Sequence, residues 1–230
     1  GSWSVTKLFE AGNTRPISGA VTIATHPLTN QRWIFFGTGR YLSSGDVTNT
    51  STQGMYGFME DTATLMPADL TLRTLSVTSG LSSGYPVRAF QSSAPLPATS
   101  KGWYINLPES GERIVQDAQI VSTFLITASM IPTGDACESD GRGYINALDA
   151  FTGTSAGGSY FDLDGDGTTS DELIGGLPIG SVNVGVGMPT LPNLLRGMVV
   201  VGGSAGSDLG APRTLSPRWD RASWREIRRD

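Results

Sequence analysis

Charged residues are scarce in this chain, and so are long apolar runs. Charged residues make up 16% of the 230 residues, against roughly 25% in an average soluble protein. The formal net charge of −5 gives no general attraction to nucleic acid, so we expect no nucleic-acid partner. No apolar run approaches the roughly 20 residues that a membrane-spanning helix needs, so we expect no transmembrane segment.

Cysteine and histidine occur once each, which removes most routes to catalysis. Cys137 has no partner for an internal disulfide, so it is either a free loop thiol or is paired with another part of a larger protein. His26, in a Thr-His-Pro stretch typical of a turn, leaves no second histidine for a zinc or two-histidine iron site. Gly-x-x-x-x-Gly-Lys phosphate loops are also missing, and the run Gly202 to Gly206 follows a strand with no clear helix after it, so we interpret it as a turn. We therefore expect that the chain is not an enzyme.

Glycine and proline are abundant instead. Thirty glycines and thirteen prolines, with many Ser and Thr, favour short strands joined by many turns. The composition therefore predicts an all-β fold with long inter-strand loops. Ser43 to Gln53 and Ala89 to Ser100 are expected as surface loops, and the β-branched stretch Glu112 to Val121 as a strand.

A strand–loop–strand pattern occurs twice. Arg32 to Gly39 is followed by Gly54 to Asp61, and Ser122 to Ala128 is followed by Gly143 to Asp149; a further strand is expected at Gly197 to Ser204. Each second strand opens on a glycine close to a tyrosine and ends on an acidic residue, and the two glycines lie 89 positions apart. Such repeats are typical of β-propellers, whose blades take roughly 40 to 50 residues. The chain has room for about three to five blades, too few to close a ring, so the remainder must come from the parent chain or another fragment.

The segment Asp162 to Glu172 carries the sharpest chemical signal. Counting Asp162 as position 1, Asp164 and Asp166 fall at positions 3 and 5, and Gly167 falls at the sharp turn of an EF-hand loop. Calcium takes six to eight oxygen ligands, so carboxylates at alternate positions suit it. The predicted calcium ligands are Asp162, Asp164, Asp166, the carbonyl of Thr168, Ser170 and Asp171.

The closing ligand stays open between Asp171 and Glu172, with Asp171 slightly favoured. Position 12 of an EF-hand is a bidentate Glu, but here it is Leu173. Glycines flank the loop on both sides, so flanking helices are not expected. Magnesium is a poorer fit because the ligand number and the flexible loop favour the larger ion. The alternative is an acidic solvated turn without metal, in which the carboxylates repel one another.

Several phrases together resemble the C-terminal domain of PilY/PilC-type proteins, the tip-associated adhesins and biogenesis factors of type IV pili. The matching phrases are Phe36 to Leu42, Gln53 to Phe58, Gly102 to Arg113, Gly143 to Gly153 and Ser223 to Ile227. They occur in the family's order over nearly the whole chain.

The resemblance implies that residues 1–230 form the C-terminal part of a modified β-propeller of a larger protein. It implies secretion through the periplasm to the pilus tip or outer-membrane surface, with minor pilins or pilus machinery, or a host or abiotic surface, as partners. Calcium in the acidic loop is linked in that family to pilus extension and retraction, and so to twitching motility and surface adhesion. Ser170 departs from the family's usual loop, which ends on Asp; here Asp171 comes one place later.

Two alternatives remain. Tyr144 to Asp149 with Thr152-Gly153 is similar to the repeat of pyrroloquinoline quinone dehydrogenases, which would make the chain part of a quinoprotein propeller enzyme. A scaffold propeller with a purely structural calcium site is the other.

Overall fold

The fold consists almost entirely of β-strands. A computed structural model describes residues 4–76, 80–91, 94–133, 141–155, 158–195, 198–208 and 213–214. Within these residues the only helical segments are the single turns α1 (Ser44–Val47) and η1 (Pro67–Asp69). The prediction of an all-β fold is therefore confirmed. None of the helices described is long and apolar enough to cross a membrane.

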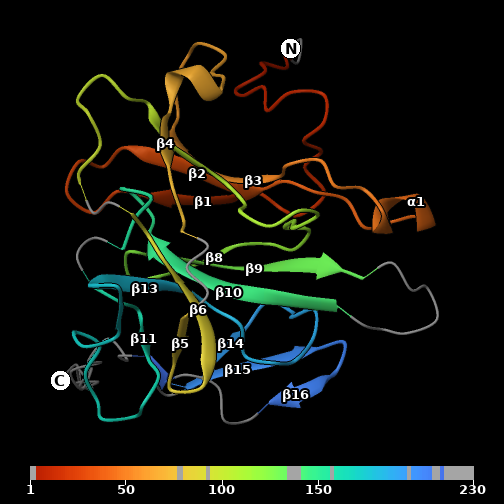
Figure 1. Ribbon diagram of the computed structural model, residues 1–230. Coiled ribbons are helices and arrows are strands. Elements are labelled where there is room, and N and C mark those ends of the chain that lie inside the picture. The colour runs from red at the N-terminus through yellow and green to blue at the C-terminus, as the bar shows by residue number, and fades with distance from the viewer. Residues whose placement is uncertain are drawn as a thin grey trace, which may run out of the picture.

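The strands form three separate sheets (Figure 1). The first sheet has the order β1 (Thr22–Thr25), β2 (Arg32–Gly37), β3 (Gly54–Met59), β7 (Gly102–Asn106), β4 (Thr71–Arg73). The second has the order β5 (Gly80–Ser82), β6 (Tyr85–Ala89), β13 (Leu177–Val182), β10 (Gly141–Asp149), β9 (Phe124–Pro132), β8 (Gln119–Val121), with β12 (Leu173–Ile174) also paired to β13. The third has the order β11 (Phe161–Asp162), β17 (Arg213–Thr214), β15 (Met198–Gly203), β14 (Asn193–Leu195), with β16 (Gly206–Asp208) paired to β15.

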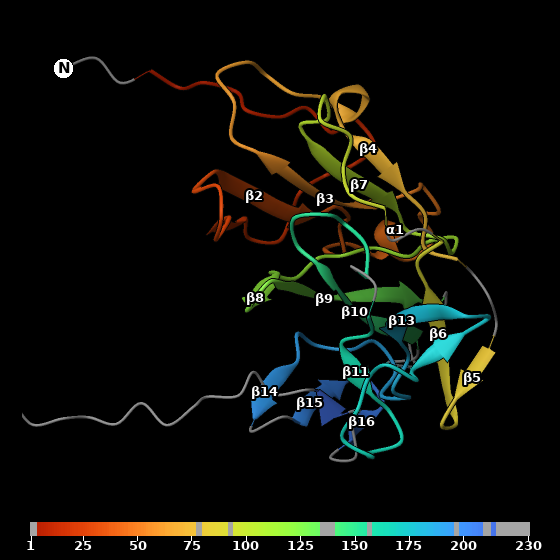
Figure 2. The same ribbon diagram turned by 90° about the vertical axis from the view of Figure 1, so that its left-hand side faces the viewer.

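The sheets are stacked in chain order, with the second sheet in the middle (Figures 1 and 2). One apolar core, which includes Phe35, Trp103 and Leu125, lies between the first and second sheets. Another, which includes Ile126 and Phe161, lies between the second and third sheets. Leu125 and Ile126 are neighbours on β9, so the central sheet buries both of its faces, as period-two alternation allows.

The repeated pattern corresponds to two antiparallel strand pairs in different sheets. β2 pairs with β3 in the first sheet and β9 pairs with β10 in the second. An acidic residue organises the turn after each second strand: Asp149 ends β10, and Asp61 lies two positions beyond the end of β3. Asp149 Oδ1 accepts hydrogen bonds from the amides of Phe151 and Thr152, and Asp61 Oδ1 accepts one from Ala63.

Trp103 of the first sheet packs against this turn of the second sheet and donates a hydrogen bond to it. Its indole is fully buried and Nε1 donates to the carbonyl of Ala150 at 2.7 Å. Gly153 has φ 72°, and a Cβ built there would lie 2.4 Å from Trp103 Cγ. Only glycine therefore lets the ring pack flat against the turn.

The prediction of a strand over Glu112 to Val121 is wrong for most of its length, because only Gln119 to Val121 forms a strand. The residues before it run between two sheets instead of joining one ladder. Arg113 exchanges backbone hydrogen bonds with Met130 of β9, whereas the next amide, Ile114, donates to Thr38 beyond β2. The β-branched residues therefore do not mark a strand along the whole segment.

Two predicted loops also differ in part from the structure. Ala89 belongs to β6 and, like Phe90, is buried, so the loop begins at Gln91. Ser43 to Gln53 contains α1, whose Asp46 is buried. Cys137 and the closing strand predicted at Ser223 to Ile227 lie outside the described residues.

Candidate metal centre

The acidic loop, residues Asp162 to Glu172, connects two sheets. Asp162 ends β11 of the third sheet, and Leu173 begins β12, which pairs with the second sheet. Strands, not helices, flank the loop, so an EF-hand-like sequence occurs outside an EF-hand fold. Gly165 and Gly167 have φ 79° and 92°, which L-residues rarely adopt, so the predicted sharp turn at Gly167 is present.

The inner half of the loop holds two buried carboxylates. Asp162 and Glu172 are each 4% exposed, and with exposed Asp164 they place one oxygen each within 4.8 Å of one another. Asp162 accepts the amides of Gly165 and Gly167, at 2.7 and 3.1 Å. Glu172 accepts the amides of Leu163 and Asp164 and the hydroxyl of Ser82 on β5. These bonds orient the carboxylates but bring no positive charge to them.

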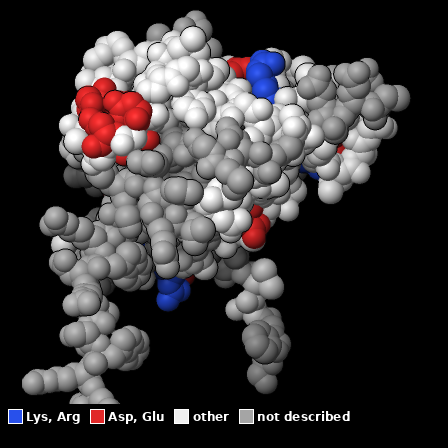
Figure 3. Space-filling model, turned by 90° about the horizontal axis from the view of Figure 1, so that it is seen from below, with Lys and Arg blue, Asp and Glu red and all other residues white. Residues whose placement is uncertain are grey.

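The outer half holds three exposed carboxylates. Asp164, Asp166 and Asp171 also place oxygens within 4.8 Å of one another. The side chain of Asp164 accepts a hydrogen bond from the amide of Asp166, and the side chain of Asp166 accepts one from the amide of Thr168. The backbone therefore curves around these two carboxylates. Acidic side chains gather compactly on one side of the face shown in Figure 3.

Asp164 belongs to both groups, so the five carboxylates form one continuous cluster. Like charges this close repel by about 1 to 4 kcal/mol per pair at effective dielectric constants between those of water and a protein surface. A hard divalent cation with oxygen ligands would offset that repulsion.

The structure brings together four of the predicted ligand residues, Asp162, Asp164, Asp166 and Asp171, and adds Glu172. The sequence left Glu172 as the alternative closing ligand, and its burial against β5 gives it a distinct place in the inner group. Thr168 is exposed and its hydroxyl donates to Asp171 Oδ1 at 2.7 Å. Ser170 is also exposed.

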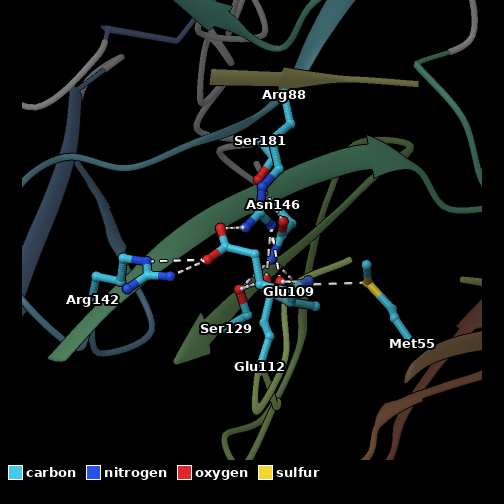
Figure 4. Close-up of polar contacts among 9 residues, drawn as sticks. Met55, Arg88, Glu109, Glu112, Ser129, Arg142, Asn146 and Ser181 are labelled. Carbon is cyan, nitrogen blue, oxygen red and sulfur yellow. Dashed lines mark hydrogen bonds and ion pairs between the residues drawn. The ribbon is translucent and has the colours of Figure 1, made fainter. Parts of the chain in front are cut away.

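A second polar cluster was not predicted from the sequence. On the face of the second sheet toward the first, Arg88, Ser181, Asn146 and Thr127 occupy partnered positions on β6, β13, β10 and β9. We call these four residues, with Ser129, the polar row; all are buried (Figure 4). Ser181 donates to Asn146 at 2.8 Å, and Thr127 reaches Met55 Sδ of the first sheet at 3.5 Å.

The polar row ends in an ion network formed by Arg88, Glu109, Glu112 and Arg142 (Figure 4). Arg88 is 2% exposed; it binds both oxygens of Glu112, contacts Glu109 and lies with Cζ 3.3 Å from the ring centroid of Tyr144. Ser129 also donates to Glu112, at 2.6 Å. Burial alone would lower the pKa of Arg88, but Glu112 and Glu109 raise it above its usual value.

Glu109 connects this network to the surface. Burial alone would raise the pKa of Glu109, but hydrogen bonds from Arg142 and Arg88 hold it below its usual value. The network was hard to predict from the sequence, because Arg88 lies in an apolar strand context. Its only signal is a charged residue between two apolar ones, which reads equally well as an outward-facing position.

Comparisons with known proteins agree on one kind of relative. A curated protein of Xylella fastidiosa (strain Temecula1), named type IV pilus biogenesis factor PilY1 homolog, is 34% identical over 99% of this chain. The type IV pilus biogenesis factor PilY1 of Pseudomonas aeruginosa (strain UCBPP-PA14) is 26% identical over 70% of the chain. A second Xylella fastidiosa PilY1 homolog is 25% identical over 77%.

The chain spans only a small part of these relatives, 19%, 17% and 12% of their lengths. No protein-family model matches the chain, and no solved structure gives a significant match. The relation therefore rests on sequence similarity to a segment of each curated relative, and the first of these alignments covers almost every residue of the chain. Over nearly its whole length, this chain is a homologue of a segment of the PilY1-type type IV pilus biogenesis factors.

Proposed function

We propose that the chain is a calcium-binding propeller segment of a type IV pilus-associated factor at the pilus tip or outer-membrane surface. There it supports calcium-regulated pilus extension and retraction, twitching motility and surface adhesion. The observation that carries the calcium site is the cluster of five carboxylates around Asp164, two of them buried without a positively charged partner among the described side chains. The homology supports the connection with pili.

Calcium would act in this proposal by fixing two sheets relative to each other. The loop leaves the third sheet at Asp162 and enters the second at Leu173, and Glu172 already holds Ser82 of β5. Without a cation, repulsion favours an open loop; with calcium, the carboxylates converge and the sheet junction stiffens. One state of the surface would then be favoured for contact with minor pilins or pilus machinery.

The propeller is supported by three face-packed sheets and by the tryptophan that fastens the first sheet to the turn of the second. Each sheet would be one blade, and the remaining blades would come from the rest of the parent protein. We propose a role without catalysis. Addition of pyrroloquinoline quinone should give neither a spectral change nor dye reduction; either signal would favour the quinoprotein alternative.

The calcium site is tested by calorimetric titration of chelator-stripped protein. The parent should bind one calcium ion, and Asp164→Ala should lose measurable binding because Asp164 belongs to both carboxylate groups. Glu60→Gln is the matched control, since Glu60 is an acidic residue far from the loop that pairs with Arg32. Equal calcium binding by Asp164→Ala and the parent would overturn the site. Tighter binding of magnesium than of calcium would show that magnesium is the preferred ion.

The regulatory role needs a second measurement in cells. Asp164→Ala in the full-length parent protein should alter twitching motility in the presence of calcium, while Glu60→Gln should not. Loss of calcium binding with unchanged pili would leave the scaffold alternative, a purely structural calcium site.

A further inference from the structure

We propose that a second site, apart from the acidic loop, binds a small organic anion that also carries hydroxyl groups, such as a uronate. The site is a pocket of about 270 Å³ beside α1, on the opposite side of the molecule from β11 in Figure 1. Its lining comes from the N-terminal segment, from the connection between β2 and β3, and from the segment after β7. The lining residues are Asn13, Thr14, Pro16, Arg40, Asn49, Ser51, Gln53 and Arg113.

All lining residues except Pro16 have polar side chains, and two of them are positively charged while none is a carboxylate, in a chain whose net charge is −5. Asp46 lies close by, and its pKa is held well below its usual range by hydrogen bonds from the Leu42 amide and the Arg40 side chain. Asp46 engages Arg40 through Nε, at 2.8 Å. The side chain of Arg40 is 54% exposed and lines the pocket, and its two terminal nitrogens take no part in the hydrogen bond with Asp46.

Arg113 is the stronger argument for an anion. It is 3% exposed, and its guanidinium donates to the carbonyl oxygens of Gly111, Arg40, Asp46 and Asn49 but to no carboxylate. Burial lowers the pKa of Arg113, and the nearby charge of Asp46 opposes that shift. Buried charges in proteins are normally paired with an opposite charge, so a guanidinium held by neutral oxygens at the floor of a pocket favours an anionic ligand.

Gln53 favours a ligand that carries a hydroxyl group. Its side-chain nitrogen donates to the carbonyls of Thr14 and Ser51, which fixes the orientation of the amide. The oxygen Oε1 is buried and has no hydrogen-bond partner, and the residue is only 5% exposed. An unmade hydrogen bond at a buried acceptor is costly, so a ligand that brings an O–H group to Gln53 would be stabilised there after a small movement of the side chain.

The volume limits the size of the ligand. Each water molecule takes about 30 Å³ in the liquid, so the pocket has room for roughly nine waters, about the size of one sugar ring. No aromatic side chain lines it, so stacking gives no affinity and recognition depends on polar contacts. A single acidic sugar meets all three conditions: one carboxylate, several hydroxyl groups and a suitable size.

The test is an NMR titration of the isotope-labelled chain with glucuronate, beside the neutral methyl glucoside and acetate. Glucuronate should shift the amide signals of residues 13–16 and 49–53 in a saturable way, and should bind at least tenfold more tightly than either of the other two compounds. Shifts absent from these residues, or equal affinity for methyl glucoside, would overturn the proposal. Equal affinity for acetate would overturn the role of the hydroxyl groups.

Variants separate the ligand contacts from the fold. Arg40→Gln should weaken glucuronate binding about tenfold or more, because a charged hydrogen bond to the carboxylate is lost. Gln53→Met, which keeps the size but removes the acceptor, should bring the affinity for glucuronate down to that for acetate. Arg32→Gln is the matched control, since Arg32 is a similarly exposed arginine paired with an acidic residue outside the pocket. Unchanged affinity in both Arg40→Gln and Gln53→Met would rule the pocket out, whether or not an Arg113 variant folds.

Discussion

Two groups of buried or partly buried carboxylates in this chain have opposite surroundings. Glu109 and Glu112 face Arg88 and Arg142, so the ion network at the end of the polar row is neutral in itself. Asp162 and Glu172 receive backbone amides and one hydroxyl, with no positive side chain among the ion pairs of the described residues. The first group is electrically neutral as folded, whereas the second carries negative charge that, under our proposal, a calcium ion would offset.

The positions of the two groups fit this difference. The ion network lies between the first and second sheets and links β6 and β10 to the segment after β7 (Figure 4). The acidic loop links the second and third sheets and stands partly in solvent. We infer that one sheet junction is fixed permanently and that the other responds to calcium.

The largest expected effect comes from breaking the ion network. Arg88→Met should lower the free energy of unfolding by about 3 to 5 kcal/mol, because Glu112 would stay buried without its positive partner. Urea unfolding measures this loss. Arg88→Met combined with Glu112→Gln should be more stable than the single variant, since no unpaired charge remains. A loss below about 1 kcal/mol in Arg88→Met would show that the network is dispensable, and the contrast with the loop would fail.

An intermediate effect is expected from calcium itself. At a calcium concentration one hundred times the dissociation constant, the parent should gain about 2.7 kcal/mol in free energy of unfolding. Asp164→Ala should gain nothing, and Arg142→Gln should keep the full gain because Arg142 belongs to the other junction. Urea unfolding with calcium and with chelator gives all the values. If the parent is equally stable with calcium and with chelator, the proposal that this sheet junction responds to calcium is wrong.

The smallest effect concerns acid. The pKa of Glu109 is lower folded than its ordinary value, so its contribution to stability is full above that ordinary value and is lost as the pH falls through the folded pKa. In chelator, where the loop contributes no bound ion, Glu109→Gln should therefore flatten the fall in stability below about pH 4.5. The expected change is about 1 kcal/mol or less, since the carboxylate is partly exposed. A parallel pH profile for the variant and the parent would assign the acid sensitivity to other carboxylates.

The fold class and most of the central strands could be predicted from the sequence. Glycine-rich turns and apolar runs locate β2, β3, β9, β10 and β15 close to their observed bounds, because local chemistry decides where a strand begins and stops. The segment Glu112 to Val121 could not be placed this way. Its backbone partners are Met130 of β9 and Thr38, which follows β2 of another sheet, and no local pattern encodes these partners.

In the acidic loop, too, some features could be predicted from the sequence and others could not. Alternate aspartates and Gly167 are contiguous in sequence, so their convergence follows from local backbone geometry, and the carboxylate set was predictable apart from the choice between Asp171 and Glu172. The burial of Glu172 depends on Ser82, ninety positions away on β5.

The all-β class, the position of the acidic loop and the homology to pilus biogenesis factors could all be predicted from the sequence, since each is carried by contiguous residues. The tertiary structure decided which sheets the loop connects, the pairing of Arg88 with Glu112, and the pocket of Gln53 and Arg113. Each of these needs residues from separate strands to meet. Their meeting is set by the stacking of the sheets and the register of their strands, and neither is encoded in any single stretch of the chain.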